Sequence, residues 1–444
     1  MTRALVAYSW LLTGVVVGLA LPAAAASARE AASPAPAVSA TENDLEDLKD
    51  LLNTNVEVWA ATKSPTSVAE VPAVVTVVTR DDMARWGYRT LADVLAQTLG
   101  FYVVNDFILP NVSVRGIGSG LFAESGNIKV MIDGHSVAFR PTGGNWLGPE
   151  LVPLAAIERI EIIRGPASAL YGADAFLGVV NVITREAASI QGAALDGLAT
   201  AVRKRTSPGG DGVIGTTGDN WSLLAAGDYT SADYSGAKLP ASSPAPNVPM
   251  YNQGATTARN LDQQSQSAFG KLTYAAGDKL ELTGWGSYSS IQRGADLSSW
   301  SQLAYGYDPQ GRLNQNRVSL QQGLFGLDGV WTARSDFSLT LNVSGAVAGP
   351  ASGDHIEVGS DLYSVHRSFG SKSVDANLEG RWNGYHNLAL TVGTSFMFDH
   401  EDLLSRLDIA KQAVAGLSPG ETIASNSDIQ GSTDLVNVGA YAQA

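Results

Sequence analysis

The sequence predicts an α/β domain over residues 71–190, followed by an antiparallel transmembrane β-barrel over residues 191–444. Three observations predict the barrel. Apolar and polar residues alternate along its strands, short and long connections alternate between the strands, and aromatic residues recur just before the short connections. Membrane β-barrels combine an outward apolar band, short turns on one side, long loops on the other and girdles of aromatic residues.

The α/β domain is predicted by local signals for strands and helices. Residues 74–78 are β-branched and predict a strand, and residues 79–86 predict a short helix that Gly87 ends. Thr90 predicts the N-cap of a second helix, because Asp93 stands three residues later in capping-box spacing. This helix is expected over residues 91–99, one helical turn at residues 167–171, and further strands at residues 111–115, 129–133, 159–164 and 179–184.

The barrel strands have one apolar and one polar face. Phe337, Leu339, Leu341 and Val343 alternate with serine, threonine and asparagine, and residues 374–382 repeat the pattern. A soluble β-sandwich also alternates in this way, so the alternation alone leaves both architectures open.

The connections between the strands favour the barrel. Three predicted strand pairs are each joined by four or five residues, and long polar segments separate the pairs. Tyr274, Trp331 and Trp382 each stand on the apolar face just before a short turn, where a sandwich has no reason to repeat an aromatic residue. Residues 195–202 and 221–229 are strand candidates without a fixed partner, which brings the count to about eight or nine strands. The three pairs are expected at residues 266–275 and 280–290, 323–332 and 337–347, and 373–382 and 388–398.

The N-terminal residues predict export. Arg3, the apolar run at residues 11–21 and the small residues after it predict a signal peptide over residues 1–28, with a transmembrane anchor as the alternative. Residues 29–70 are rich in alanine, serine, proline and acidic residues, and this composition predicts a flexible leader.

Composition and motifs argue against several classes of protein. The 444 residues include no cysteine and carry a net charge of −14, which argues against binding of nucleic acid. No HExxH, GxSxG or Walker motif is present, so we expect no enzyme. The five histidines are scattered along the sequence, and we expect neither a metal site nor a cofactor.

Residues 157–185 form the most informative run of the sequence. A predicted strand, a Gly-Pro turn, one helical turn, a glycine break and a second strand follow one another, and this run closely resembles the C-terminal half of the plug domain of TonB-dependent outer-membrane receptors. The resemblance extends over residues 56–190. Its motif positions are Arg115, Gly116, Asp133, Gly134, Arg164, Gly165, Pro166, Tyr171, Gly172, Gly178 and Asn181.

The resemblance implies roles for several residues. Arg115 and Arg164 are expected either to form ion pairs with barrel carboxylates such as Glu281 or Glu379, or to pair within the plug. Residues 56–60 resemble the TonB box, an extended segment that can add to the edge of a partner sheet, with an ordinary linker as the alternative. The TonB box would comprise Val56, Glu57, Val58, Trp59 and Ala60, and the outer-loop candidates for ligand contact are Asp106, Phe107, Arg140 and Trp146, which could equally lie in plain turns.

The implied function is active import of a scarce ligand across the outer membrane after removal of the signal peptide. The implied partners are TonB, outer-membrane lipid and a small molecule, with a ferric siderophore expected first and cobalamin as the alternative. A ligand-binding surface protein without transport is a rival, whereas a passive porin conflicts with a plug. Plugged barrels of the family have about 22 strands, so we expect an N-terminal portion of a longer receptor or a non-functional truncated product.

Overall fold

The computed structural model divides the chain into two compact units, Met1–Thr54 and Asn55–Ala444. Every described residue lies in the second unit. Several predicted residues lie outside the described ones, namely the signal peptide, Val56, Trp59, Ala60, Asp106, Phe107, Pro166 and Gly172. The structure describes residues 57–58, 66–67, 73–105, 108–118, 125–165, 167–171, 175–202, 205–235, 261–294, 317–354, 356–358, 363–384, 389–408 and 429–443.

The α/β domain contains a five-stranded mixed sheet in the order β3-β9-β10-β7-β8. Strand β9 pairs antiparallel with both β3 and β10, and β7 lies parallel to β10. A second sheet has the order β4-β5-β6. The strands are β3 (Val74–Thr79), β4 (Phe101–Asn105), β5 (Pro110–Val114), β6 (Ile117–Gly118), β7 (Lys129–Ile132), β8 (His135–Ser136), β9 (Ile157–Arg164) and β10 (Gly178–Thr184).

The helices of this domain begin where the sequence predicts. Helix α2 (Arg80–Trp86) has a complete capping box between Thr79 and Asp82, and Gly87 ends it with a left-handed φ of 71°. Helix α3 (Leu91–Gln97) has the predicted box between Thr90 and Asp93 but ends two residues early, at Gln97. The shorter elements are η1 (Leu154–Ala156), α4 (Ser168–Tyr171) and η2 (Ala187–Ser189).

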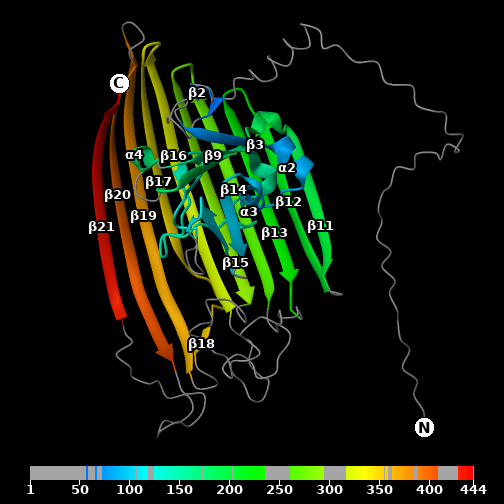
Figure 1. Ribbon diagram of the computed structural model, residues 1–444. Coiled ribbons are helices and arrows are strands. Elements are labelled where there is room, and N and C mark those ends of the chain that lie inside the picture. The colour runs from blue at the N-terminus through cyan, green and yellow to red at the C-terminus, as the bar shows by residue number, and fades with distance from the viewer. Residues whose placement is uncertain are drawn as a thin grey trace, which may run out of the picture. The chain divides into compact units, whose positions relative to one another are not determined.

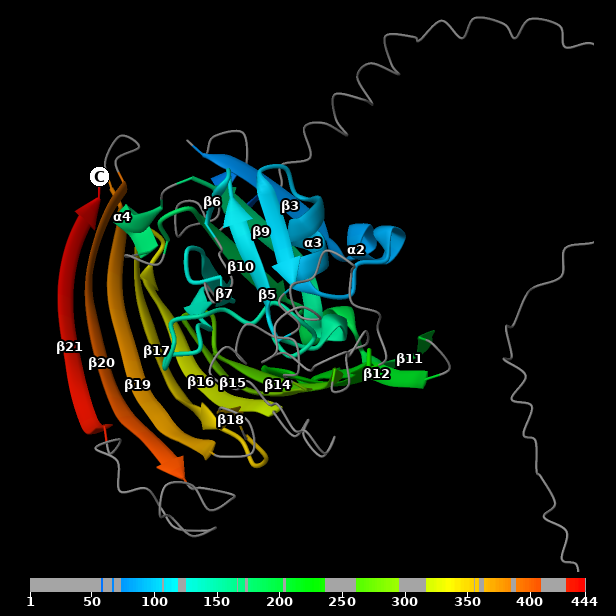
Figure 2. The same ribbon diagram turned by 60° about the horizontal axis from the view of Figure 1, so that its bottom comes forward.

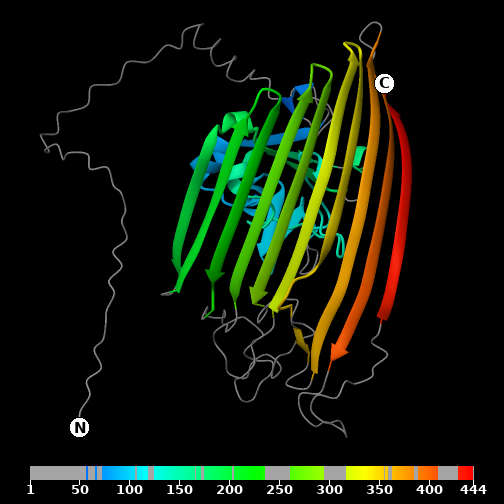
Figure 3. The same cartoon turned by 180° about the vertical axis from the view of Figure 1, so that it is seen from behind.

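Ten strands form one continuous antiparallel path in the described part of residues 192–443. This large sheet is not closed there, because β11 and β21 each pair on one side only, and Figures 1 and 3 show it from its two faces. The short strand β18 (Ile356–Val358) pairs with β19 off the path. The strands of the path are β11 (Gly192–Val202), β12 (Arg205–Thr217), β13 (Trp221–Asp233), β14 (Asp262–Ala276), β15 (Leu280–Gly294), β16 (Arg317–Arg334), β17 (Phe337–Pro350), β19 (Tyr363–Asn383), β20 (Ala389–Asp408) and β21 (Ile429–Gln443).

Strand β12 was not among the predicted strands. Its sequence contains Pro208 and four glycines, which disfavour a strand by propensity. Pairing with β11 over residues 205–215 and with β13 over residues 209–217 holds it extended, so pairing overrides the local preference. The two strand candidates at residues 195–202 and 221–229 therefore lie on either side of β12 and do not pair with each other.

The two faces of the large sheet differ as predicted. Tyr274, Trp331 and Trp382 are exposed on the outer face beside the short turns, and Trp221 lies directly opposite Tyr274. The opposite face is concave and carries the α/β domain, as Figure 2 shows. No helix among the described residues is long and apolar enough to cross a membrane.

One apolar core joins the α/β domain to the large sheet. Ile160, Ile162 and Val180 are buried in the domain and belong to the same cluster as Phe269 and Leu324 of the sheet. Burial of each such side chain contributes about 1.5–3 kcal/mol. The domain is thus packed against the sheet and not merely tethered to it.

Candidate functional site

The contact between the α/β domain and the concave face of the large sheet is built around four basic side chains. The most deeply buried of them is Arg293, near the long-loop end of β15, which meets Glu150 of the α/β domain at 3.0 Å. The exposed fractions of the two side chains are 6% and 0%. Arg293 also donates to the carbonyl oxygens of Ile108, Gln264 and Gln292 and to the hydroxyl of Ser265, so that its five N–H donors match five bonds.

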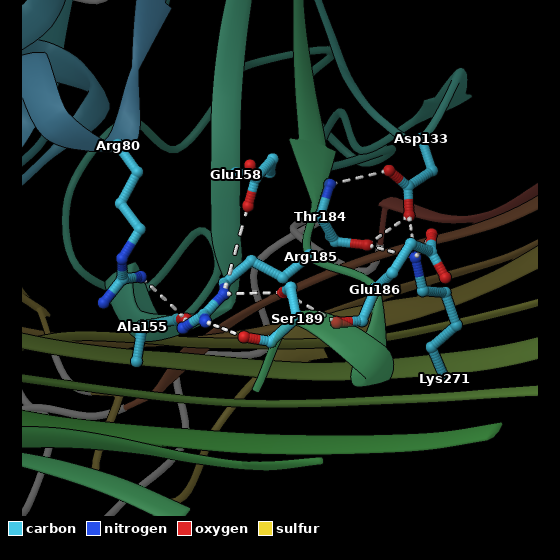
Figure 4. Close-up of polar contacts among 9 residues, drawn as sticks. All are labelled: Arg80, Asp133, Ala155, Glu158, Thr184, Arg185, Glu186, Ser189 and Lys271. Carbon is cyan, nitrogen blue, oxygen red and sulfur yellow. Dashed lines mark hydrogen bonds and ion pairs between the residues drawn. The ribbon is translucent and has the colours of Figure 1, made fainter. Parts of the chain in front are cut away.

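The second group is Lys271 of β14, which lies nearer to the short-turn end of that strand. Figure 4 shows the contacts of its side chain. Its Nζ donates to Thr184 Oγ1 at 2.8 Å and to Glu186 Oε1 at 2.9 Å, and lies 3.6 Å from Asp133 Oδ2. Asp133 in turn accepts bonds from the amide and the hydroxyl of Thr184. Lys271 therefore contacts the ends of the neighbouring strands β7 and β10.

The third group is His135, the single histidine of the α/β domain. Its Nε2 lies 2.9 Å from Asp328 Oδ1 of β16, and the same carboxylate accepts a 2.7 Å bond from Asn342 Nδ2 of β17. The ring of Trp285 lies 4.8 Å from the imidazole.

The fourth group is Arg140, in the loop that reverses between Phe139 and Gly144. Its guanidinium bridges two neighbouring strands of the sheet, lying 2.5 Å from Asp375 of β19 and 3.4 Å from Asp399 of β20. The prediction of Arg140 as a ligand contact thus falls on a residue that binds the sheet.

Trp146 does not lie open to a ligand as the sequence suggested. Its side chain is 1% exposed and stacks on Phe139 at 5.0 Å. The two rings belong to an apolar cluster shared with the large sheet, so Trp146 packs the interface. The full cluster contains Ile108, Leu109, Phe139, Trp146, Ile291, Val318, Leu320 and Ala348.

The expectation that Arg115 and Arg164 form ion pairs with Glu281 or Glu379 is wrong, and their alternative pairing within the α/β domain is observed. Arg164 donates to the carbonyl of Leu99 at 3.1 Å and to the hydroxyl of Thr76 at 3.2 Å. Arg115 donates to the carbonyl of Arg164 at 3.5 Å. The ion pairs do not form because both guanidinium groups point toward carbonyl oxygens of the α/β domain itself.

The remaining motif residues hold turns and close approaches. Asp133 and Gly134 take φ of 47° and 86°, and the amide of Gly134 donates to Asn181 Oδ1 at 3.0 Å. A Cβ on Gly178 would lie 2.8 Å from the carbonyl oxygen of Ile163, so only glycine fits beside β9. Arg115, Gly116 and Gly165 also have positive φ.

Tyr171 of the motif is mostly buried. Burial and the nearby carboxylate of Glu161 raise the pKa of its phenol well above the ordinary value. The neutral hydroxyl therefore persists over the physiological range, which suits a structural role.

Two arginines of the α/β domain, Arg80 and Arg185, meet at Ala155, as Figure 4 shows. The carbonyl of Ala155 accepts bonds from Arg80 at 3.1 Å and Arg185 at 3.4 Å, while its amide donates to Asp211 of β12 at 2.9 Å. Burial and the charge of Arg80 lower the pKa of Arg185, and the carboxylate of Glu158 opposes the shift. Helix η1 is thereby fixed between the domain and the sheet.

No group of three or more potential metal ligands occurs among the residues that the structure describes. The arrangement of charges instead forms an interface that holds a domain inside a curved sheet.

Comparison with known proteins identifies this architecture. Residues 67–179 match the family described as TonB-dependent Receptor Plug Domain. An iron-regulated outer membrane virulence protein of Vibrio cholerae is 35% identical over 181 residues, which are 37% of this chain and 26% of that protein. The chain thus spans about a quarter of the length of the curated relatives it matches.

Solved structures share the fold. The ferripyoverdine receptor of Pseudomonas aeruginosa has a TM-score of 0.59 at 17% identity, covering 87% of this chain and 51% of that one. The siderophore receptor PirA from Acinetobacter baumannii has a TM-score of 0.58 at 18% identity, covering 83% and 53%.

Residues 67–179 therefore carry a TonB-dependent receptor plug domain, and the large sheet has the fold of part of the barrel in these receptor structures. The α/β domain is hereafter called the plug, and the large sheet the barrel wall.

Proposed function

We propose that the protein imports an iron chelate across the outer membrane, with TonB supplying the energy. The observation that carries the proposal is the polar character of the plug–barrel contact at Lys271, His135 and Arg140. Ionic contacts that water can reach are individually weak, so they can break and reform more easily than an apolar core. The apolar core shared with the sheet keeps the plug in place, and these weaker polar contacts allow part of it to be displaced and returned.

The choice of an iron chelate as cargo rests on the relatives. The Vibrio cholerae protein is named as iron-regulated, and the structural neighbours include a receptor bound to ferripyoverdine and a ferric citrate transporter. The net charge of the whole chain, −14, is compatible with a metal-bearing ligand. Cobalamin is the alternative cargo, and its uptake is measured in parallel in the experiment below.

The coupling to TonB is assigned to residues 56–60. Within this segment Glu57–Val58 is the strand β1, which pairs antiparallel with β2 (Thr66–Ser67). The extended, paired backbone of Glu57–Val58 suits strand addition to a partner sheet. Side-chain changes there should be tolerated, whereas proline should not, because proline removes an N–H donor.

The test compares Val58→Pro with Val58→Ala in the native host, using radioactive iron supplied as ferric siderophores and labelled cobalamin in parallel. We expect Val58→Pro to bind the ligand normally and lose uptake, and Val58→Ala to retain both. Uptake of wild-type strength in the proline variant would contradict the coupling role. Uptake of cobalamin alone would contradict the cargo while leaving the receptor class intact.

A further inference from the structure

The outer face of the barrel wall contains a hollow of about 500 Å³ over strands β11–β15. Figure 3 shows the wall from this side, with β11–β13 in green. Three large side chains surround the hollow, Leu195, Tyr229 and Tyr288, and their exposed fractions are 86%, 47% and 43%. Asp211 also borders it, but its side chain turns the other way and accepts a bond from the amide of Ala155 in the plug. The hollow thus faces away from the plug.

Small residues form the floor of this hollow. A Cβ built on Gly227 would have its nearest neighbour at 3.9 Å, so the space above this glycine is open. The side chain of Leu195 lies across Gly212, because a Cβ there would meet it at 2.5 Å. Three small residues therefore separate two large ones in a single cross-strand row, which runs Leu195, Gly212, Gly227, Ala268 and Tyr288.

The length of the hollow along the strands matches one leaflet of a bilayer. Ala225 and Gly270 continue the floor by one row toward the short turns, and the exposed pair Leu223 and Leu272 closes it in the next row. Tyr229 closes the other end. Residues 223–229 span about 20 Å at the rise of an antiparallel strand. With a strand tilt of about 35–45°, the depth is about 15 Å, half of a hydrocarbon core of about 30 Å.

Outward-facing residues also fix the height of the hollow in the membrane. Trp221 marks the interface on the side of the short turns. On the other side Gln266 lies directly opposite Tyr229, and the hydroxyl of Tyr288 donates to Gln321 Oε1 at 3.2 Å. Tyrosines beside polar side chains are typical of a membrane–water interface. Because the long connections of such barrels are extracellular, the hollow lies in the outer leaflet, between the head groups and the midplane.

From this shape we propose that the hollow binds an acyl chain of an outer-leaflet lipid, with Tyr229 and Tyr288 at the level of the lipid head group. A membrane-spanning helix of a partner would need a groove across the whole core of about 30 Å, whereas Leu223 and Leu272 close this one at the midplane. Lipid chains are as apolar as the wall, so binding comes from dispersion contacts that fill the hollow. The chain lies against the backbone of β13, because Gly227 has no side chain.

The first test needs no variant. The protein is reconstituted into phosphatidylcholine vesicles that contain a phosphatidylcholine with a diazirine in its acyl chain, and cross-linked peptides are mapped after illumination. We expect residues 223–229 and 266–272 to be labelled at least about fivefold more than residues 325–331 and 339–343 of the same outer face, a preference equivalent to about 1 kcal/mol. Equal labelling of the two regions overturns the proposal.

The second test fills the hollow. Gly227→Leu places its side chain in open space, and should reduce the labelling of residues 223–229 and 266–272 to that of the comparison region. Gly284→Leu is the matched control, because Gly284 faces outward between Leu272 and Leu327, beyond the closed end, and also has open space around it. This control should keep the wild-type pattern. Undiminished labelling in a folded Gly227→Leu protein contradicts the site.

The third test identifies the occupant in native outer membranes. The sequence has no cysteine, so a benzophenone attached to Ala268→Cys reacts from the floor of the hollow alone. We expect an adduct with the mass of a lipid, in clear excess over the adduct formed from Gly284→Cys. An adduct with another protein or with a second copy of this chain overturns the proposal, as does an equal lipid adduct at the two positions.

Discussion

Replacement of Lys271 by methionine is expected to loosen the plug by a calculable amount. Methionine preserves the apolar stem but removes the ammonium that reaches Thr184, Glu186 and Asp133. Glu186 is mostly exposed, so its pair with Lys271 contributes about 0.5 kcal/mol. The charged hydrogen bond to Thr184 is buried and contributes about 1.5 kcal/mol.

The sum of about 2 kcal/mol corresponds to about a 30-fold rise in the population with an open interface. Ser287→Cys reports this population, because Ser287 is buried and lies in register between Phe269 and Leu324, which belong to the core shared with the plug. The rate of thiol labelling under conditions of fast reclosing is proportional to the fraction open. The measurement is therefore the labelling rate with and without Lys271→Met.

The matched control is Lys279→Met, since Lys279 is exposed in the turn after β14 and should leave the labelling rate unchanged. A labelling rate that rises less than about threefold in Lys271→Met would correspond to under about 0.7 kcal/mol. Such a result would refute the assignment of Lys271 as a contact that holds the plug.

Two further predictions concern the stability of the plug. Trp146→Ala should lower the free energy of unfolding by about 3–5 kcal/mol in urea titrations, because it empties a buried site; unchanged stability with weaker ligand binding would instead restore the ligand-contact role. The hydroxyl and the amide of Thr79 hold the pKa of Asp82 below its ordinary value. That stabilisation is present above the unfolded-state pKa and is lost as the pH falls through the folded-state pKa, so Asp82→Ala should lower the melting temperature at pH 7 by an amount corresponding to about 1 kcal/mol and converge with the wild type in acid. An equal difference at every pH would contradict this linkage.

The elements of the plug could be predicted because their signals are local. Thr79 and Thr90 each begin a helix through a capping box within three residues, and Gly87 supplies the left-handed residue that ends the first. The alternation of apolar and polar residues along the barrel strands could also be recognised in the sequence, because successive side chains of any strand point to opposite faces. Strand β12 could not be read this way, because pairing with β11 and β13 overrides its glycine-rich sequence.

The contacts that hold the plug could not be predicted, because they join residues far apart in the sequence. Lys271 and Thr184 are separated by 87 positions, and Arg293 and Glu150 by 143. Alternation places both basic residues on the inner face of their strands but says nothing of what they meet there. The same limit explains Arg115 and Arg164, whose motif was recognised although the direction of their side chains was not.

The distribution of polarity over the interface connects these observations to transport. A plug held only by apolar packing would resist displacement, and one held only by exposed ion pairs would be lost from the barrel. Here both kinds of contact lie together, because the neighbours of Lys271 on the adjacent strands, Leu224 and Trp285, belong to the apolar core, whereas the Glu186 that Lys271 binds is mostly exposed. Loss of Lys271 alone should therefore loosen the plug without releasing it.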